Sequence, residues 1–206
     1  MDKKELLLER IEDGDDLNCS EELEIFELSP EEAENLLLKY VCNHPLYPKA
    51  QIKMLSLPLK IAKKVLIKYL ENHWLSDEAQ LKIFELSPEA AKELLLEYAT
   101  KSEYLCNDAC LKIFDFTPEI AKEILLEYIK ENCLCDDAEL KIFDLPRDIA
   151  KEVLLKYVDS YYLCDDAQLK IFDLPEKDAK EVLSSYIEKW NLSQKAKQKA
   201  TSLGWM

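Results

Sequence analysis

The chain has 206 residues, a formal net charge of −15, and hydrophobic and charged fractions of 48% and 33%, a balance typical of a folded protein rather than a disordered one. Its two glycines disfavour phosphate-binding glycine loops and flexible linkers. The acidic excess disfavours nucleic acid and anionic membranes as direct partners, because phosphate binding depends on clustered Lys and Arg.

Residues 1–16 form a charged opening segment that lacks the apolar core of a signal peptide. No stretch of the sequence approaches the ~18 uninterrupted apolar residues of a membrane span. We therefore expect a cytoplasmic protein whose seven cysteines are free thiols rather than a disulfide framework. Residues 3–11 are similar to residues 91–99, which predicts an N-terminal half-repeat that caps the fold.

Six repeats follow over residues 17–191. We take the first residue of each LKIFDL-like motif as an anchor, and the anchors lie 29 or 30 residues apart at Leu23, Ile52, Leu81, Leu111, Leu140 and Leu169. Four columns are constant: Leu six residues before the anchor, and Ala, Leu and Tyr at ten, fourteen and seventeen residues after it. The last three columns share one helix face, because spacings of three and four residues return to the same side.

Each repeat predicts two short helices. The first carries a broad apolar stripe and an expected capping box, at Asp77–Gln80, Asp136–Glu139 and Asp165–Gln168. The second begins at Ser-Pro or Thr-Pro, or at Pro alone, as at Ser29, Ser87, Thr117, Pro58, Pro146 and Pro175. Within residues 134–158 we expect the core to contain Leu134, Leu140, Ile142, Phe143, Ala150, Leu154 and Tyr157.

Residues 192–206 match the start of another first helix, with the polar Gln198 in the anchor column, as a capping helix requires. The prediction is an all-α fold: a right-handed superhelical α-solenoid of about fourteen short antiparallel helices, built from 29–30-residue two-helix repeats in a single domain of residues 1–206. The pattern resembles the α-solenoid class of HEAT, armadillo and tetratricopeptide repeats, although its period is shorter than theirs. This resemblance implies a scaffold or protein-binding role on a curved surface.

Two columns raise the alternative of a metal or redox site. Cys106, Cys135 and Cys164 share one column, and His44 and His73 share another. Stacked helices lie ~8–10 Å apart, so one column makes a line of sulfur atoms rather than four ligands around one ion. We therefore expect half-buried thiols, no metal and no cofactor.

Two sets of residues are candidates for binding a partner. Acids at the starts of the first helices form what we name the acidic row: Asp77, Glu78, Asp108, Asp136, Asp137, Asp165 and Asp166. These acids either compensate the helix dipole or attract a basic patch on a partner. Aromatic residues in the variable connections either form an interface or pack onto the edge of the fold: Trp74, Tyr104, Tyr161, Tyr162 and Trp190.

The sequence contains no Ser-His-acid set, HExxH motif or nucleotide fingerprint, so we expect a protein that is not an enzyme. The leading hypothesis is a monomeric protein-binding module or scaffold, which uses a curved acidic surface to engage a protein with a basic patch. It predicts no direct contact with nucleic acid or membrane. The alternative is an acidic nucleic-acid mimic, for example a phage-encoded inhibitor that occupies the basic groove of a host defence nuclease.

Overall fold

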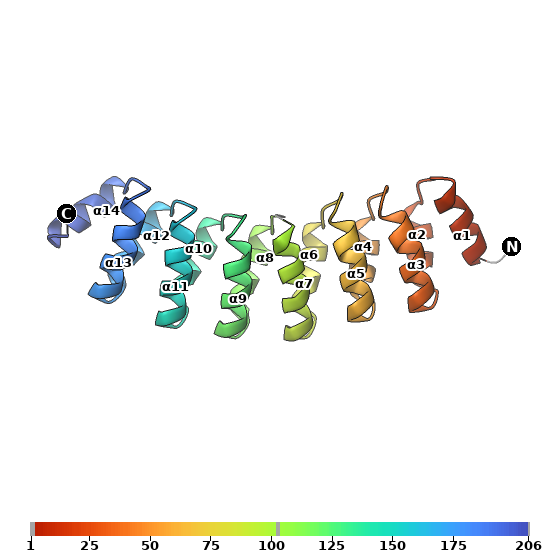
Figure 1. Cartoon of the computed structure of the whole chain (residues 1–206), viewed down its shortest axis with the longest axis horizontal. Helices are drawn as coiled ribbons and strands as arrows, with labels where there is room; N and C mark the ends of the chain where they lie inside the picture. The colour runs from red at the N-terminus through yellow and green to blue at the C-terminus, as the bar shows by residue number, and fades with distance from the viewer. Residues whose placement is uncertain (1–2, 102–103, 206) are drawn as a thin grey trace. The chain divides into compact units, whose positions relative to one another are not determined.

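The computed structural model describes residues 3–101 and 104–205, and within these ranges its regular structure is entirely helical. The predicted all-α fold class is therefore confirmed. The chain divides into two compact units, Met1–Ala109 and Cys110–Met206, and each is described by itself (Figure 1). Among the described helices, none is long and apolar enough to cross a membrane.

Unit 1 contains two sets of helices, each packed in chain order. The first set is α1 (Lys3–Glu12), α3 (Pro30–Tyr40), α5 (Leu59–Tyr69) and α7 (Pro88–Thr100). The second set is α2 (Cys19–Ile25), α4 (Pro48–Leu55) and α6 (Asp77–Ile83). Within each set, successive helices thus contact each other. Helix α8 (Asn107–Lys112) spans the boundary between the units.

Unit 2 follows the same scheme. Helices α9 (Pro118–Tyr128), α11 (Arg147–Val158) and α13 (Glu176–Ile187) pack in order, as do α10 (Asp136–Ile142), α12 (Asp165–Lys170) and α14 (Gln194–Ser202). Two first helices end in a 3-10 turn, η1 (Ile113–Asp115) and η2 (Ile171–Asp173). Below, α2, α4, α6, α8, α10 and α12 are the first helices, and α3, α5, α7, α9, α11 and α13 are the second helices.

The constant columns of the sequence form the core of both units. The Tyr column is buried throughout: Tyr40, Tyr69, Tyr98, Tyr128, Tyr157 and Tyr186. The Ala and Leu columns of the second helices are buried with it. The prediction for residues 134–158 is wrong at two positions, because Leu140 and Phe143 are only half-buried and Glu139 is buried instead. The core face of α10 therefore consists of Ala138, Glu139 and Ile142.

The expected capping boxes are also corrected. The helix-capping position falls one residue before each expected Asp, at Ser76, Cys135 and Cys164. Ser76 Oγ accepts a hydrogen bond from the backbone N–H of Ala79, which a capping residue is expected to do. Both Ser29 and Ser87 cap their helices as predicted, and Pro30 and Pro88 occupy the first helical position.

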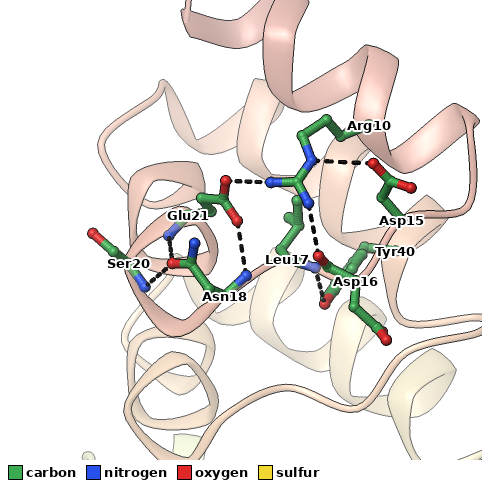
Figure 2. A network of polar contacts seen from close by, with 8 residues as sticks. All are labelled: Arg10, Asp15, Asp16, Leu17, Asn18, Ser20, Glu21 and Tyr40. Atoms are coloured by element: carbon green, nitrogen blue, oxygen red, sulfur yellow. Dashed lines mark hydrogen bonds and ion pairs between the residues drawn. The ribbon is translucent and has the colours of Figure 1, made fainter.

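Arg10 ties the N-terminal helix α1 to the first connection (Figure 2). Its guanidinium group pairs with Glu21 and with Asp15, and Nη2 donates to the carbonyl oxygen of Asp16 at 2.9 Å. Glu21 also completes a capping box with Asn18. Arg10 occupies the position of Tyr69 and Tyr98 in the sequence period, whose hydroxyls donate to the equivalent carbonyl oxygens of Trp74 and Tyr104.

Candidate functional site

The acidic row lies in the first turns of its helices, as the sequence predicts. Asp77 and Glu78 begin α6, and Asp108 lies in the first turn of α8. In unit 2, Asp136 and Asp137 begin α10, and Asp165 and Asp166 begin α12. All seven side chains are exposed, and none forms an ion pair within the described part of the chain. Their carboxylates stabilise the positive helix ends and stay open to a partner.

Acids on the second helices have a different environment, because lysines of the neighbouring helix pair with them. In unit 1, Lys64 of α5 lies 2.6 Å from Glu34 of α3. In unit 2, Lys122 of α9 lies 2.6 Å from Glu152 of α11. Several acids in the middle of the second helices are therefore paired with lysines, whereas no ion pair of the acidic row occurs among the described residues.

The connections of unit 1 present aromatic side chains to solvent. Trp74 is 74% exposed, Tyr104 is 65% exposed, and Tyr47, which the sequence reasoning did not select, is 49% exposed. The backbone beneath them is held in place. Tyr69 Oη donates to the carbonyl oxygen of Trp74 at 3.2 Å, and Tyr98 Oη donates to that of Tyr104 at 3.1 Å. A rigid backbone lowers the entropy that these aromatics lose on binding.

In unit 2 the structure separates the three candidate aromatics. Tyr162 is 67% exposed. Tyr161 packs on the core ring of Tyr157, with ring centroids 5.3 Å apart. Trp190 donates its indole N–H to the carbonyl oxygen of Val158 at 2.8 Å and is half-buried. Tyr161 and Trp190 are therefore held by contacts with the fold. Tyr162 packs its ring edge-on against that of Trp190 and stays mostly exposed.

Two hollows lie side by side along the connections of unit 1. The first has a volume of about 350 Å³ and is lined by residues that include Asp16, Tyr40, Tyr47 and Pro48. The second has a volume of about 340 Å³ and is lined by residues that include Tyr69, Asn72, His73 and Trp74. Pro45 and Leu46 line both hollows, so the two are neighbours. We name them the first hollow and the second hollow.

A set of buried polar side chains was missed by the sequence reasoning. These residues directly precede the anchors, and we name them the polar column: Glu22, Gln51, Gln80, Glu139 and Gln168. Each accepts a hydrogen bond from a backbone N–H 25 or 26 residues further along the chain, at 2.7 to 2.8 Å. The polar column thus fixes the start of each following connection. A signal was present in the sequence, because Gln or Glu recurs at this position.

Gln51 shows how a member of the polar column is satisfied. Its Nε2 donates to the carbonyl oxygen of Leu46 and to Tyr69 Oη, both at 2.9 Å. Its Oε1 accepts from the N–H of Ser76 at 2.8 Å. One amide therefore joins its own helix pair to the next connection. Every polar atom of the group has a partner, as a buried amide requires.

Glu22 occupies the same place with a carboxyl group. Its Oε2 accepts from the N–H of Tyr47 at 2.8 Å, but its Oε1 is buried without a hydrogen-bond partner. Burial raises the pKa of Glu22 to about 7, against the lowering effect of the Tyr47 N–H. Burial also raises the pKa of Glu139, whose Oε1 accepts from Tyr157 Oη at 2.8 Å.

One group of potential metal ligands occurs among the described residues: atoms of Asp136, Glu139 and Cys164 lie within 4.8 Å of one another. Both oxygens of Glu139 already accept hydrogen bonds, from Tyr157 Oη and from the N–H of Cys164. Burial raises the pKa of the Cys164 thiol to about 11, which favours the neutral thiol over the thiolate that binds metals. The group does not support a metal site.

Comparison with known proteins gives no relative from which to transfer a function. No protein-family model, curated protein or solved structure matches this chain.

Proposed function

We propose that the chain is a non-enzymatic protein-binding module that engages a partner with a basic patch. The binding surface is the loop edge of unit 1, which we define as residues 41–47 and 70–78. Trp74 is the observation that carries the proposal. It is 74% exposed and its carbonyl oxygen is fixed by Tyr69, and α6 begins three residues later with the exposed Asp77 and Glu78. An aromatic anchor on a rigid support is typical of an interface hot spot.

The charge distribution supports a basic partner. Acids in the middle of the second helices, such as Glu34 and Glu97, are paired with lysines, whereas Asp77 and Glu78 are exposed without an ion-pair partner among the described residues. Unpaired carboxylates raise the rate of encounter with a basic surface and select against acidic partners. Asp136, Asp137, Asp165 and Asp166 offer the same charge in unit 2.

We also propose the finer architecture that the sequence predicts: a right-handed superhelical solenoid of six helical-hairpin repeats in one domain, with caps at residues 1–16 and 192–206. The order of helix contacts within each unit supports it, as do the links made by the polar column. Small-angle X-ray scattering of the full chain tests this proposal. A solenoid gives the pair-distance distribution of an elongated monomer, whereas a compact profile would contradict it.

The second candidate is the acidic nucleic-acid mimic, and the unpaired acidic row favours it. Such a mimic needs a dense acidic face. On the first helices, however, basic residues follow the acids within a turn or two, as Lys141 follows Asp137 and Lys170 follows Asp166. Lys170 lies 3.9 Å from Asp144 and therefore interleaves with the acids of unit 2. This mixture of charge favours a protein binder over a mimic.

A capture experiment with the full-length protein tests the proposal. One variant removes the exposed aromatic and the two acidic charges of the loop edge of unit 1, with Trp74→Ala, Asp77→Asn and Glu78→Gln. A second neutralises Asp136, Asp137, Asp165 and Asp166. The matched control neutralises Glu31, Glu89, Glu119 and Asp148, which are equally exposed in the first turns of second helices.

Proteins captured from a lysate are identified by mass spectrometry. The proposal predicts that the wild type and the control capture the same proteins. The three-residue variant of unit 1 should no longer capture them. If the three-residue variant captures the same proteins as the wild type, the loop edge of unit 1 is not the binding surface. Captured nucleic-acid-binding enzymes that DNA displaces, and that the second variant loses, would support the mimic instead.

A further inference from the structure

The two hollows of unit 1 occupy equivalent positions of the sequence period. Tyr40 lines the first hollow and Tyr69 lines the second, and these residues are 29 apart in the Tyr column. Pro45 and Trp74 are likewise 29 apart, and each forms a wall contributed by a connection. The loop edge of unit 1 therefore carries two neighbouring hollows at equivalent positions of consecutive repeats, which together we name the groove.

The length of that repeat matches one kind of extended ligand. Helices α3 and α5 pack directly on each other, and packed helices lie ~8–10 Å apart. A polyproline II helix rises about 3.1 Å per residue with three residues per turn, so residues three apart lie ~9.3 Å apart on one face. A β-strand places residues three apart on opposite faces, and an α-helix advances only ~5.4 Å per turn. An α-helix approaches this spacing only with residues seven apart, after two turns and ~10.8 Å, whereas the polyproline II form reaches it with residues three apart in a single turn.

The chemistry of the groove suits prolines. Aromatic-lined grooves bind polyproline II segments, because flat proline rings pack on aromatic rings and the backbone carbonyls of the ligand remain available as acceptors. Trp74 is 74% exposed and presents an indole N–H, and Tyr47 is 49% exposed and presents a phenol hydroxyl. Both groups can donate to those carbonyls.

The charge along the groove is uneven, and this gives the ligand a direction. Lys49 lies in the first turn of α4, which contains no acid. Asp77 and Glu78 lie in the first turn of α6, beside the second hollow and Trp74. Asp16 also lines the first hollow, but its Oδ1 lies 2.5 Å from His44 Nδ1, so a basic ligand residue is most favoured beside Asp77 and Glu78.

We propose that the loop edge of unit 1 binds an extended proline-containing peptide in the polyproline II conformation. Prolines three residues apart occupy the first and second hollows, and a Lys or Arg of the peptide lies beside Asp77 and Glu78. This inference depends on the proposed function, because it names the class of segment that the protein-binding surface accepts.

The test is a fluorescence-polarisation titration of the full-length protein. The probes are two labelled peptides of proline–alanine–alanine repeats, with a pair of arginines at one end or at the other. Matched peptides replace the prolines by alanine or the arginines by glutamate. We expect one of the two arginine peptides to bind more tightly than the other, and both replacements to weaken binding about tenfold or more.

Variants of the protein locate the site. Trp74→Ala is expected to weaken binding of the better peptide about tenfold or more, since buried aromatic anchors dominate such interfaces. Asp77→Asn with Glu78→Gln is expected to weaken binding and to flatten its salt dependence. The matched control is Tyr162→Ala, an equally exposed aromatic in unit 2, and it should leave the affinity unchanged. Circular dichroism of each variant shows whether it is folded.

The outcomes separate this inference from the proposed function. If neither proline peptide binds, or if the all-alanine peptide binds as tightly, the polyproline inference is overturned. It is also overturned if Trp74→Ala leaves peptide binding unchanged. If the three-residue variant of unit 1 fails to capture the proteins that the wild type captures, the protein-binding proposal stands even when the peptides do not bind. If this variant captures the same proteins as the wild type, both the protein-binding proposal and the polyproline inference fail.

Discussion

Glu22 accepts a hydrogen bond of 2.8 Å from the backbone N–H of Tyr47, 25 residues further along the chain, with a carboxyl group that is fully buried. The same link is made by the amides Gln51, Gln80 and Gln168, whose Nε2 also donates to a leucine carbonyl oxygen of the same helix pair. A carboxylate cannot make that donation. A protonated carboxyl group carries a hydroxyl that can act as a donor.

Glu22→Gln is expected to stabilise the protein at neutral and alkaline pH. The pKa of Glu22 is raised to about 7, so the folded state holds a proton that the unfolded state releases near the ordinary pKa of ~4.5. The stabilisation that comes from this bound proton is complete below pH ~4.5 and is lost as the pH rises through about 7. Urea unfolding should give nearly equal stability at pH 5 and an advantage of about 1–3 kcal/mol for the variant at pH 8. Glu89→Gln, an exposed control, should show no such growth with pH. A difference between wild type and Glu22→Gln that stays constant with pH would contradict the prediction.

Tyr157→Phe is expected to lower the free energy of unfolding by about 1–3 kcal/mol, because it leaves buried polar atoms without partners. The hydroxyl donates to Glu139 Oε1 at 2.8 Å and accepts from the N–H of Leu134 at 3.3 Å. Urea unfolding at fixed pH measures the loss. The control Tyr162→Phe removes an exposed hydroxyl and should change nothing measurable. Equal stability of the two variants would show that the buried hydroxyl contributes no net stabilisation.

Arg10→Ala is expected to loosen the N-terminal end of unit 1. Arg10 joins α1 to Glu21 of α2 and to the carbonyl oxygen of Asp16, and no other described side chain in Figure 2 makes these links. Amide hydrogen exchange in residues 3–18 should become faster, while exchange in α5 stays unchanged. The control Lys39→Ala removes an exposed pair with Glu12 and should have a smaller effect. Unchanged exchange in the Arg10 variant would assign the stability of α1 to its apolar contacts alone.

The cysteines are expected to differ in reactivity in a way that follows burial. Burial raises the pKa of Cys164 to about 11 and also raises the pKa of Cys106, so little thiolate is present at pH 8. Cys133 is exposed. Iodoacetamide followed by mass spectrometry should therefore modify Cys133 before Cys164, and the difference should disappear in urea. Modification of folded Cys164 at the rate of Cys133 would contradict this order.

Much of the fold follows from periodicity in the sequence. The Tyr, Ala and Leu columns predict the buried face of the second helices, because their spacing places them on one side of a helix, and the structure buries all three. The starts of the second helices follow from Ser-Pro at Ser29 and Ser87. The predicted loop positions of Trp74, Tyr104 and Tyr162 coincide with exposed aromatics.

The tertiary structure alone decided which residues of the first helices are core. Leu140 and Phe143 are apolar yet half-buried, whereas Glu139 is buried, because its carboxyl group meets Tyr157 and the N–H of Cys164. A hydrophobic pattern predicts that Glu and Gln lie on the surface. Their spacing from a nearby Asp then predicts a local role in a capping box. Their true partners lie 18 to 26 residues away and come within reach only after the helices pack. Local periodicity therefore determined the helices and their apolar faces, while long-range hydrogen bonds determined the polar column and the rigid connections that carry Trp74.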